Sequence, residues 1–196
     1  MGHWQREIGE PTSWILAILA VALALGKWKS ALDPGFYVSP LFISIIVAFL
    51  AHELAHKLVG RKYGMVTEFV VYTPGLLLTI LSGLLPVVIL APGYVKTLIY
   101  YYTRSTEKGI VASVAAGPAT NIIISLLSIL LLTAYSNAYT TVHHLLAYMA
   151  WVNSWIAFFN LLPIPPLDGS KLASRSRGLW ISLFAISLLL LVYIQL

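Results

Sequence analysis

Long apolar runs alternate with short polar segments along this chain, and their lengths predict membrane helices. A helix needs about 20 apolar residues to cross the hydrocarbon core of a bilayer. We expect core helices at about 38–59, 109–134 and 143–163, and accessory helices at about 13–28 and 178–196. The pattern predicts an all-α polytopic membrane protein with about five to six transmembrane helices. We expect a single domain over residues 1–196.

The first apolar run has two interpretations. Its residues 13–26 are short for a span and resemble the apolar region of a cleaved signal peptide. Glu7 and Glu10 precede it, however, and acidic residues are atypical of a basic leader. We therefore favour a first helix that is retained.

Between the first two core helices the pattern changes to one that favours strands. The segment 66–104 contains β-branched and aromatic stretches around an apolar insertion at 75–92 that glycine and prolines interrupt. Basic residues are frequent in 57–109 and 164–177 and absent from 135–142, which places the first two segments on the cytoplasmic side. That alternation requires an insertion that does not cross the membrane. We expect two or three strands and a re-entrant or interfacial insertion.

Composition supports a membrane protein and excludes several other classes. Hydrophobic residues make up 59% of the chain and charged residues only 10%, which is improbable for a soluble globular domain. Cysteine is absent, so any metal ligands must be His, Asp or Glu. The net charge of +5 is explained by basic residues between the apolar runs, and nothing indicates nucleic-acid binding. The expected surroundings are a lipid bilayer.

The second apolar run carries the motif "HELAH" at residues 52–56. Histidines four residues apart lie on one face of a helix, where His52 and His56 can share one zinc ion. Glu53 between them can take a proton from a water held by that zinc, which is the chemistry of peptide hydrolysis by metalloproteases. Another interpretation is polar packing or a proton relay between helices.

A catalytic zinc site usually has three protein ligands, so the motif needs a partner. His143 and His144 lie on the predicted outer side, away from the motif, and are better interpreted as interfacial polar residues. Asp168 follows prolines within 163–166 that break a helix at membrane depth on the cytoplasmic side. An Asp-Gly after prolines is often only a turn, but beside a motif that lacks one ligand Asp168 is the preferred candidate.

Three motifs in order resemble the site-2 proteases, a family of intramembrane zinc metalloproteases. They are "HELAH" at 52–56, "AGPATN" at 116–121 and "NLLPIPPLDG" at 160–169. The resemblance implies one Zn²⁺ per chain held by His52, His56 and Asp168, with Glu53 as the catalytic base. It also implies transmembrane substrates that another protease has already cut. The chain resembles a compact form without a PDZ domain, and Ser170 and Lys171 stand where the family commonly continues with glycine.

Five further residues are candidates for oxyanion stabilisation or substrate binding. They are Asn160, Asn121, Gly117, Gly93 and Tyr94. Asn160 can donate a hydrogen bond to an oxyanion or cap its own helix. Gly117 and Asn121 are four residues apart and permit close helix packing as well as substrate contact, and Pro118 is expected to bend or interrupt their helix. Strand addition of an unwound substrate near 94–97 is a further hypothesis.

The leading function is an intramembrane zinc endopeptidase of the cell membrane whose active site faces the cytoplasm. One alternative is a metal or proton transporter, which predicts polar residues at several depths along several helices. Here the polar residues converge on one level. Another alternative is a catalytically inactive membrane binding protein, which the retention of all three ligands and Glu53 disfavours.

Overall fold

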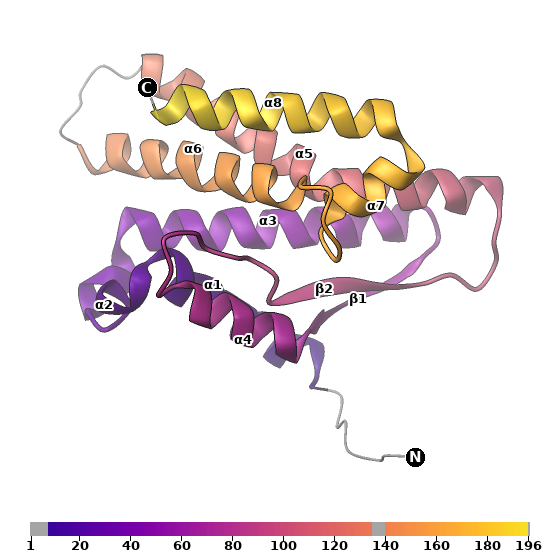
Figure 1. The fold of residues 1–196 in the computed structure, drawn as a ribbon, viewed down its shortest axis with the longest axis horizontal. Helices are drawn as coiled ribbons and strands as arrows, with labels where there is room; N and C mark the ends of the chain where they lie inside the picture. The colour runs from indigo at the N-terminus through magenta and orange to yellow at the C-terminus, as the bar shows by residue number, and fades with distance from the viewer. Residues whose placement is uncertain (1–7, 135–139, 196) are drawn as a thin grey trace.

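Long helices form a bundle, and a smaller layer with a two-stranded sheet lies against one side of it (Figure 1). The computed structural model describes residues 8–134 and 140–195. The helices are α1 (Glu10–Leu25), α2 (Lys27–Ala31), α3 (Pro40–Lys62), α4 (Thr73–Ser82), α5 (Arg104–Ala134), α6 (Thr141–Asn160), α7 (Asp168–Arg175) and α8 (Arg177–Gln195), with a 3-10 helix, η1, at Pro34–Val38. The strands are β1 (Val66–Val71) and β2 (Gly93–Leu98).

The bundle contains four of the five predicted membrane helices, and α1 lies in the smaller layer (Figure 1). Within the described residues, α3, α5 and α8 are long and apolar enough to cross a membrane, whereas α1 and α4 are shorter apolar helices. The predicted core helices correspond to α3, α5 and α6, which pack on one another. The mainly helical membrane architecture is therefore confirmed, and the expected number of spans stays a prediction.

Local sequence signals define both ends of α3. The Ser39 hydroxyl caps the helix by accepting a hydrogen bond from Phe42 N–H at 3.2 Å, and Pro40 occupies the first turn. At the other end Gly64 adopts a φ of 78°, which a glycine does without strain. The helix thus continues to Lys62, three residues past the end that hydropathy predicts at 59, because the cap and not the apolar run terminates it.

A threonine pair starts α5 earlier than the apolar run predicts. Thr103 N–H donates to the Thr106 hydroxyl oxygen at 2.7 Å, and Thr106 N–H donates to the Thr103 hydroxyl oxygen at 3.1 Å. The helix therefore begins at Arg104 and includes a polar first turn. Pro118 lies inside α5 without interrupting it; neighbouring helices in membrane bundles commonly compensate for the missing proline N–H.

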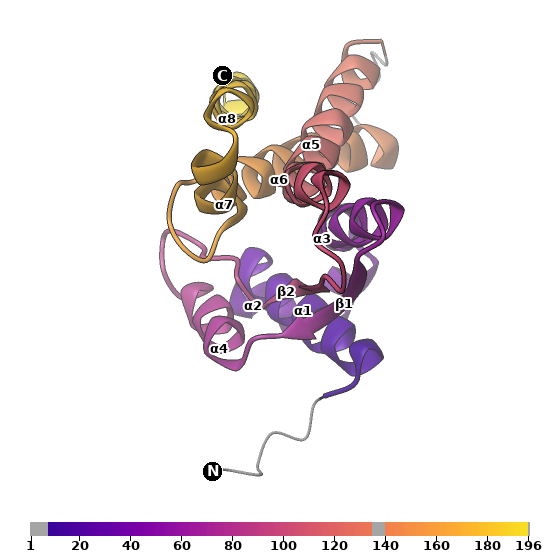
Figure 2. The same ribbon diagram turned by 90° about the vertical axis from the view of Figure 1, so that its right-hand side faces the viewer.

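The segment 66–104 forms one antiparallel hairpin with a helical insertion. Val66 pairs with Leu98 and Val71 with Gly93, and the sheet has two strands within the described residues. The insertion contains α4, which is too short for a span and packs beside α1. Figure 2 shows the sheet between α3 and the α1–α4 pair. The predicted small strand element is confirmed, with two strands, and the re-entrant or interfacial position of the insertion stays a prediction.

Glu10 joins α1 and β1 of this layer to α3 of the bundle. Its Oε1 atom accepts hydrogen bonds from the Lys57 ammonium, from Phe69 N–H at 3.1 Å and from Trp14 Nε1–H at 3.3 Å. The Trp14 ring stacks on Phe69 with 4.3 Å between centroids. Burial, which raises the pKa of the Glu10 carboxyl, is outweighed by the hydrogen bonds from Lys57, Phe69 and Trp14, so that its pKa lies below the ordinary value of 4.5.

Glu10→Gln is expected to destabilise the fold by about 1–3 kcal/mol at neutral pH, because it removes the charge that Lys57 pairs with. A lowered pKa means that this stabilisation is fully present above pH 4.5 and is lost as the pH falls through the lowered folded value. The difference in unfolding free energy between wild type and variant, measured in detergent from pH 7 downward, should shrink accordingly. Glu68→Gln, at an exposed carboxylate of β1, is the control, and a constant difference would contradict the expectation.

Candidate metal centre

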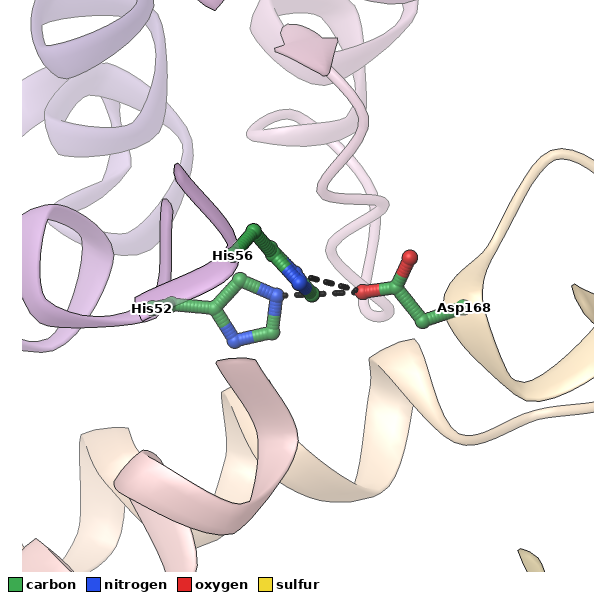
Figure 3. A group of neighbouring side chains, drawn as sticks. All are labelled: His52, His56 and Asp168. Carbon is green, nitrogen blue, oxygen red and sulfur yellow. Dashed lines mark hydrogen bonds and ion pairs between the residues drawn. The ribbon is translucent and has the colours of Figure 1, made fainter. Parts of the chain in front are cut away.

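The three predicted ligands converge on one point inside the bundle (Figure 3). Asp168 Oδ2 lies 3.3 Å from His52 Nε2 and 2.9 Å from His56 Nε2. All three side chains are buried, with relative exposures of 2% for His52, 7% for His56 and 8% for Asp168. Within the described residues they form the single cluster of this kind that could hold a metal ion.

The proline-rich segment after α6 brings Asp168 to the histidines. The helix ends at Asn160, and Asp168 is the first residue of α7. Gly169 lets α7 pack against the end of α6, because a Cβ at this position would lie 2.1 Å from the Leu161 carbonyl oxygen. Trp180 of α8 donates to the same carbonyl at 2.9 Å. The helix break thus places a carboxylate at the depth of the zinc motif.

Hydrogen bonds orient both imidazoles with their Nε2 atoms toward the centre. His56 Nδ1 lies 2.7 Å from the Ser113 carbonyl oxygen, which can only accept, so Nδ1 is the donor. The Ser113 hydroxyl donates in return to the His56 carbonyl at 2.7 Å. His52 Nδ1 lies 2.6 Å from Asn121 Oδ1. Each ring therefore donates from Nδ1 and turns Nε2 inward.

This arrangement fits a divalent metal ion. Neutral imidazoles that donate from Nδ1 offer the lone pairs of both Nε2 atoms, beside the Asp168 carboxylate, to a cation placed among them. Two ligand atoms of a tetrahedral zinc site are about 3.3 Å apart, close to the separations of Asp168 Oδ2 from His52 Nε2 and from His56 Nε2. Nitrogen and oxygen donors without thiolate suit Zn²⁺.

Gly117 of α5 leaves space beside the ligands. A Cβ on this residue would lie 2.3 Å from His56 Nε2 and 2.8 Å from His52 Nε2. Any other side chain would therefore occupy the volume next to both ligand nitrogens. This explains why α5 presents a glycine there, and it gives Gly117 a place in the metal centre.

Glu53 lies directly beside the first ligand on α3. Its side chain is buried, with 9% relative exposure. The predicted catalytic base thus lies on the same helix as two of the candidate ligands and next to His52 in the sequence.

Lys171 completes the surroundings of Asp168. Its ammonium donates to Asp168 Oδ1 at 3.0 Å, while Oδ2 faces the histidines. Ser170 forms a bond of its own from its hydroxyl to the Leu167 carbonyl at 2.8 Å. Ser170 and Lys171, which depart from the family pattern, are therefore compatible with the turn that begins α7. The contact of Lys171 with Asp168 was not predicted from the sequence, although their i, i+3 spacing on α7 allows it.

The other candidate residues differ from one another in position and contacts. Asn160 donates from Nδ2 to the Ile156 carbonyl of its own helix at 3.0 Å. Gly93 begins β2, packed closely against Val70, and Tyr94 is 47% exposed. His143 and His144 lie in the first turn of α6, at the opposite end of that helix from the metal centre.

Two residues near the centre were not singled out from the sequence, namely Ser113 and Asn153. Asn153 Oδ1 accepts a hydrogen bond from Asn121 Nδ2 at 2.7 Å. The signal for Ser113 was its place in a stripe of small and polar residues at intervals of four on an otherwise apolar helix, with Gly117, Asn121 and Ser125. Asn153 had only its polarity within an apolar run as a signal.

Known proteins resemble this chain. The family described as peptidase family M50 matches residues 133–177. "Putative zinc metalloprotease MJ0611" of Methanocaldococcus jannaschii is 32% identical over 90% of this chain and 87% of its own length. "Putative zinc metalloprotease Rip2" of Mycolicibacterium smegmatis is 30% identical over 84% and 70%, and "Putative zinc metalloprotease YwhC" of Bacillus subtilis is 30% identical over 67% and 66%. No solved structure matches the chain.

Proposed function

This chain belongs to peptidase family M50, the site-2 proteases, and from that premise we propose that it hydrolyses peptide bonds of transmembrane protein substrates with Glu53 as the catalytic base. Its class, a zinc metalloprotease of a membrane-embedded family, follows from the relatives and the apolar helices. The observation that carries the proposal is the convergence of His52, His56 and Asp168 beside Glu53, buried among helices long enough to span a bilayer.

The mechanism assigns each residue one task. His52, His56 and Asp168 would hold Zn²⁺, which supplies Lewis-acid polarisation of the scissile carbonyl and lowers the pKa of the attacking water. Glu53 accepts one proton from that water as its oxygen bonds to the carbonyl carbon. Glu53 then gives this proton to the nitrogen as the C–N bond breaks. The remaining proton of the new carboxyl group passes to the amine, so that the products are a carboxylate and an ammonium group.

A transmembrane substrate must unwind before its carbonyl can react, because helical carbonyls are committed to internal hydrogen bonds. The outer edge of β2 can receive such an extended segment as an added strand. Phe69 N–H points away from β2, toward Glu10, and Phe69 pairs with Val95. In an antiparallel pair both partners then point outward, so Val95 N–H faces the outer edge of β2. Val95 also packs against the hydrophobic cluster that contains Leu167, the residue before Asp168.

Val95→Pro is expected to reduce cleavage of a transmembrane substrate about fivefold to tenfold. Proline removes the outward N–H, one hydrogen bond of about 1–1.5 kcal/mol to the substrate backbone, and spares the bonds to β1. The matched control is Val71→Pro, which removes an outward N–H from the opposite edge of the sheet. Initial rates on one reconstituted substrate check this, and equal rates for the two variants would reject strand addition at β2.

The proposal also includes the side of the membrane that the active site faces and prior cleavage of the substrate by another protease. The metal centre lies toward the end of α3 that carries Lys57, Arg61 and Lys62, and α7 adds Lys171 and Arg175. Positive residues favour the cytoplasmic side, which supports an active site facing the cytoplasm of a cell membrane. Burial of the centre also favours substrates that another protease has already shortened. Cleavage of a single-span substrate in proteoliposomes, with fragments identified by mass spectrometry, tests the function.

A further inference from the structure

We propose that Asn121 is a positioning residue of the metal centre, which holds His52 in the orientation that metal binding needs and is itself held by Asn153. The proposal rests on the zinc site of the proposed function but not on its substrate. It assigns to "AGPATN" a role in organising the ligands. The contacts that carry it join α3, α5 and α6, which lie side by side (Figures 1 and 2).

A chain of hydrogen bonds gives Asn121 one allowed orientation. Asn153 Nδ2 donates to the Met149 carbonyl at 2.8 Å, so Asn153 Oδ1 faces Asn121. Asn121 Nδ2 donates to that oxygen at 2.7 Å and to the Ala48 carbonyl at 3.0 Å. A reversed amide would place an oxygen against two other oxygens.

The orientation of the Asn121 amide in turn determines which nitrogen of His52 carries the hydrogen. Asn121 presents only its Oδ1 acceptor to His52 Nδ1, at 2.6 Å. The ring hydrogen therefore resides on Nδ1, and Nε2 keeps its lone pair for the metal. The Met149 carbonyl of α6 thus determines, through Asn153 and Asn121, which nitrogen of His52 is available to the metal.

Because these side chains are buried, water cannot easily replace the hydrogen bonds between them. Asn121 and Asn153 have relative exposures of 0% and His52 of 2%. If the asparagine acceptor is removed, the imidazole loses the hydrogen bond that fixes its rotation about the Cβ–Cγ bond, and the buried Nδ1–H is left without a partner. His56 differs, because its acceptor is the Ser113 backbone carbonyl, which no side-chain substitution removes. The two ligands are therefore unequally sensitive to mutation.

Ser125 provides a matched control on the same face of α5. Its hydroxyl donates to the Ala150 carbonyl of α6 at 3.0 Å, and its relative exposure is also 0%. Ser125→Ala therefore removes a buried α5–α6 hydrogen bond one turn from Asn121 without changing the partners of His52. A difference between variants at the two positions reports on the ligand and not on helix packing in general.

The experiment measures metal binding by the full chain in detergent and needs no substrate. Asn121→Leu, which keeps the number of side-chain heavy atoms and the branching at Cγ, is expected to weaken Zn²⁺ binding about 10–100-fold in a chelator competition. It should also alter the visible d–d absorption of the Co²⁺-substituted protein. Asn153→Leu leaves the His52 contact in place and frees the Asn121 amide, so we expect a smaller change in the same direction. Ser125→Ala should match wild type in both measurements.

Each outcome bears on the proposal. Wild-type Zn²⁺ affinity and an unchanged Co²⁺ spectrum in Asn121→Leu would overturn it, as would equal effects in Ser125→Ala. If Asn121→Leu does not fold, judged by circular dichroism of the metal-free protein, Asn153→Leu decides in the same way. A wild-type chain that binds no Zn²⁺ would refute the zinc site itself, whereas one that binds Zn²⁺ but cleaves no transmembrane substrate would refute only the proposed substrate class.

Discussion

Glu53→Gln is expected to lower the rate of peptide hydrolysis by about 10²–10⁴-fold while the protein still binds one Zn²⁺. Glutamine has nearly the same size as glutamate but cannot accept the proton of the attacking water. The metal ligands His52, His56 and Asp168 are unchanged, so binding of Zn²⁺ should remain. The measurements are the initial rate on a reconstituted transmembrane substrate and the zinc content of the purified variant.

The control for Glu53→Gln is Asp168→Ala, which removes a ligand and spares the base. That variant should lose both zinc and hydrolysis, so the two substitutions separate proton transfer from metal binding. Hydrolysis at a wild-type rate in Glu53→Gln would refute the assignment of the base. Loss of zinc in Glu53→Gln would instead mean that the glutamate helps to hold the metal.

Gly117→Ala is expected to abolish stoichiometric zinc binding and to reduce hydrolysis by about 100-fold or more. The added Cβ would lie 2.3 Å from His56 Nε2 and 2.8 Å from His52 Nε2. Hydrogen bonds to Ser113 and Asn121 hold the two rings, so relief requires that the ligands or α5 move. A displacement of about 1 Å at a reacting centre can cost 10²-fold in rate.

The control for Gly117→Ala is Gly109→Ala, on the same helix. A Cβ at position 109 would lie 2.4 Å from Tyr63 Cβ, which is an equally short contact away from the metal centre. Zinc content and metal-free thermal stability should be measured for both variants. If both lose zinc equally, the effect of Gly117→Ala is one of helix packing; selective loss at position 117 supports the space beside the ligands.

The ends of the helices show why hydropathy predicts cores better than boundaries. Apolar length placed α3 and α5 correctly, but Gly64 and the Thr103–Thr106 pair moved their termini outward. Caps act through single hydrogen bonds and backbone angles, which an average over many residues does not detect.

The sequence by itself determined that His52, Glu53 and His56 share a short stretch of helix, because a helical period is a local property of the chain. It also indicated Asp168 as a candidate ligand, because the prolines within 163–166 end the preceding helix. Only the tertiary structure decided that Asn121 accepts from His52, that Ser113 accepts from His56 and that Gly117 leaves room between them. These contacts depend on the rotation and register of α5 and α6 against α3, which result from the packing of side chains far apart in sequence.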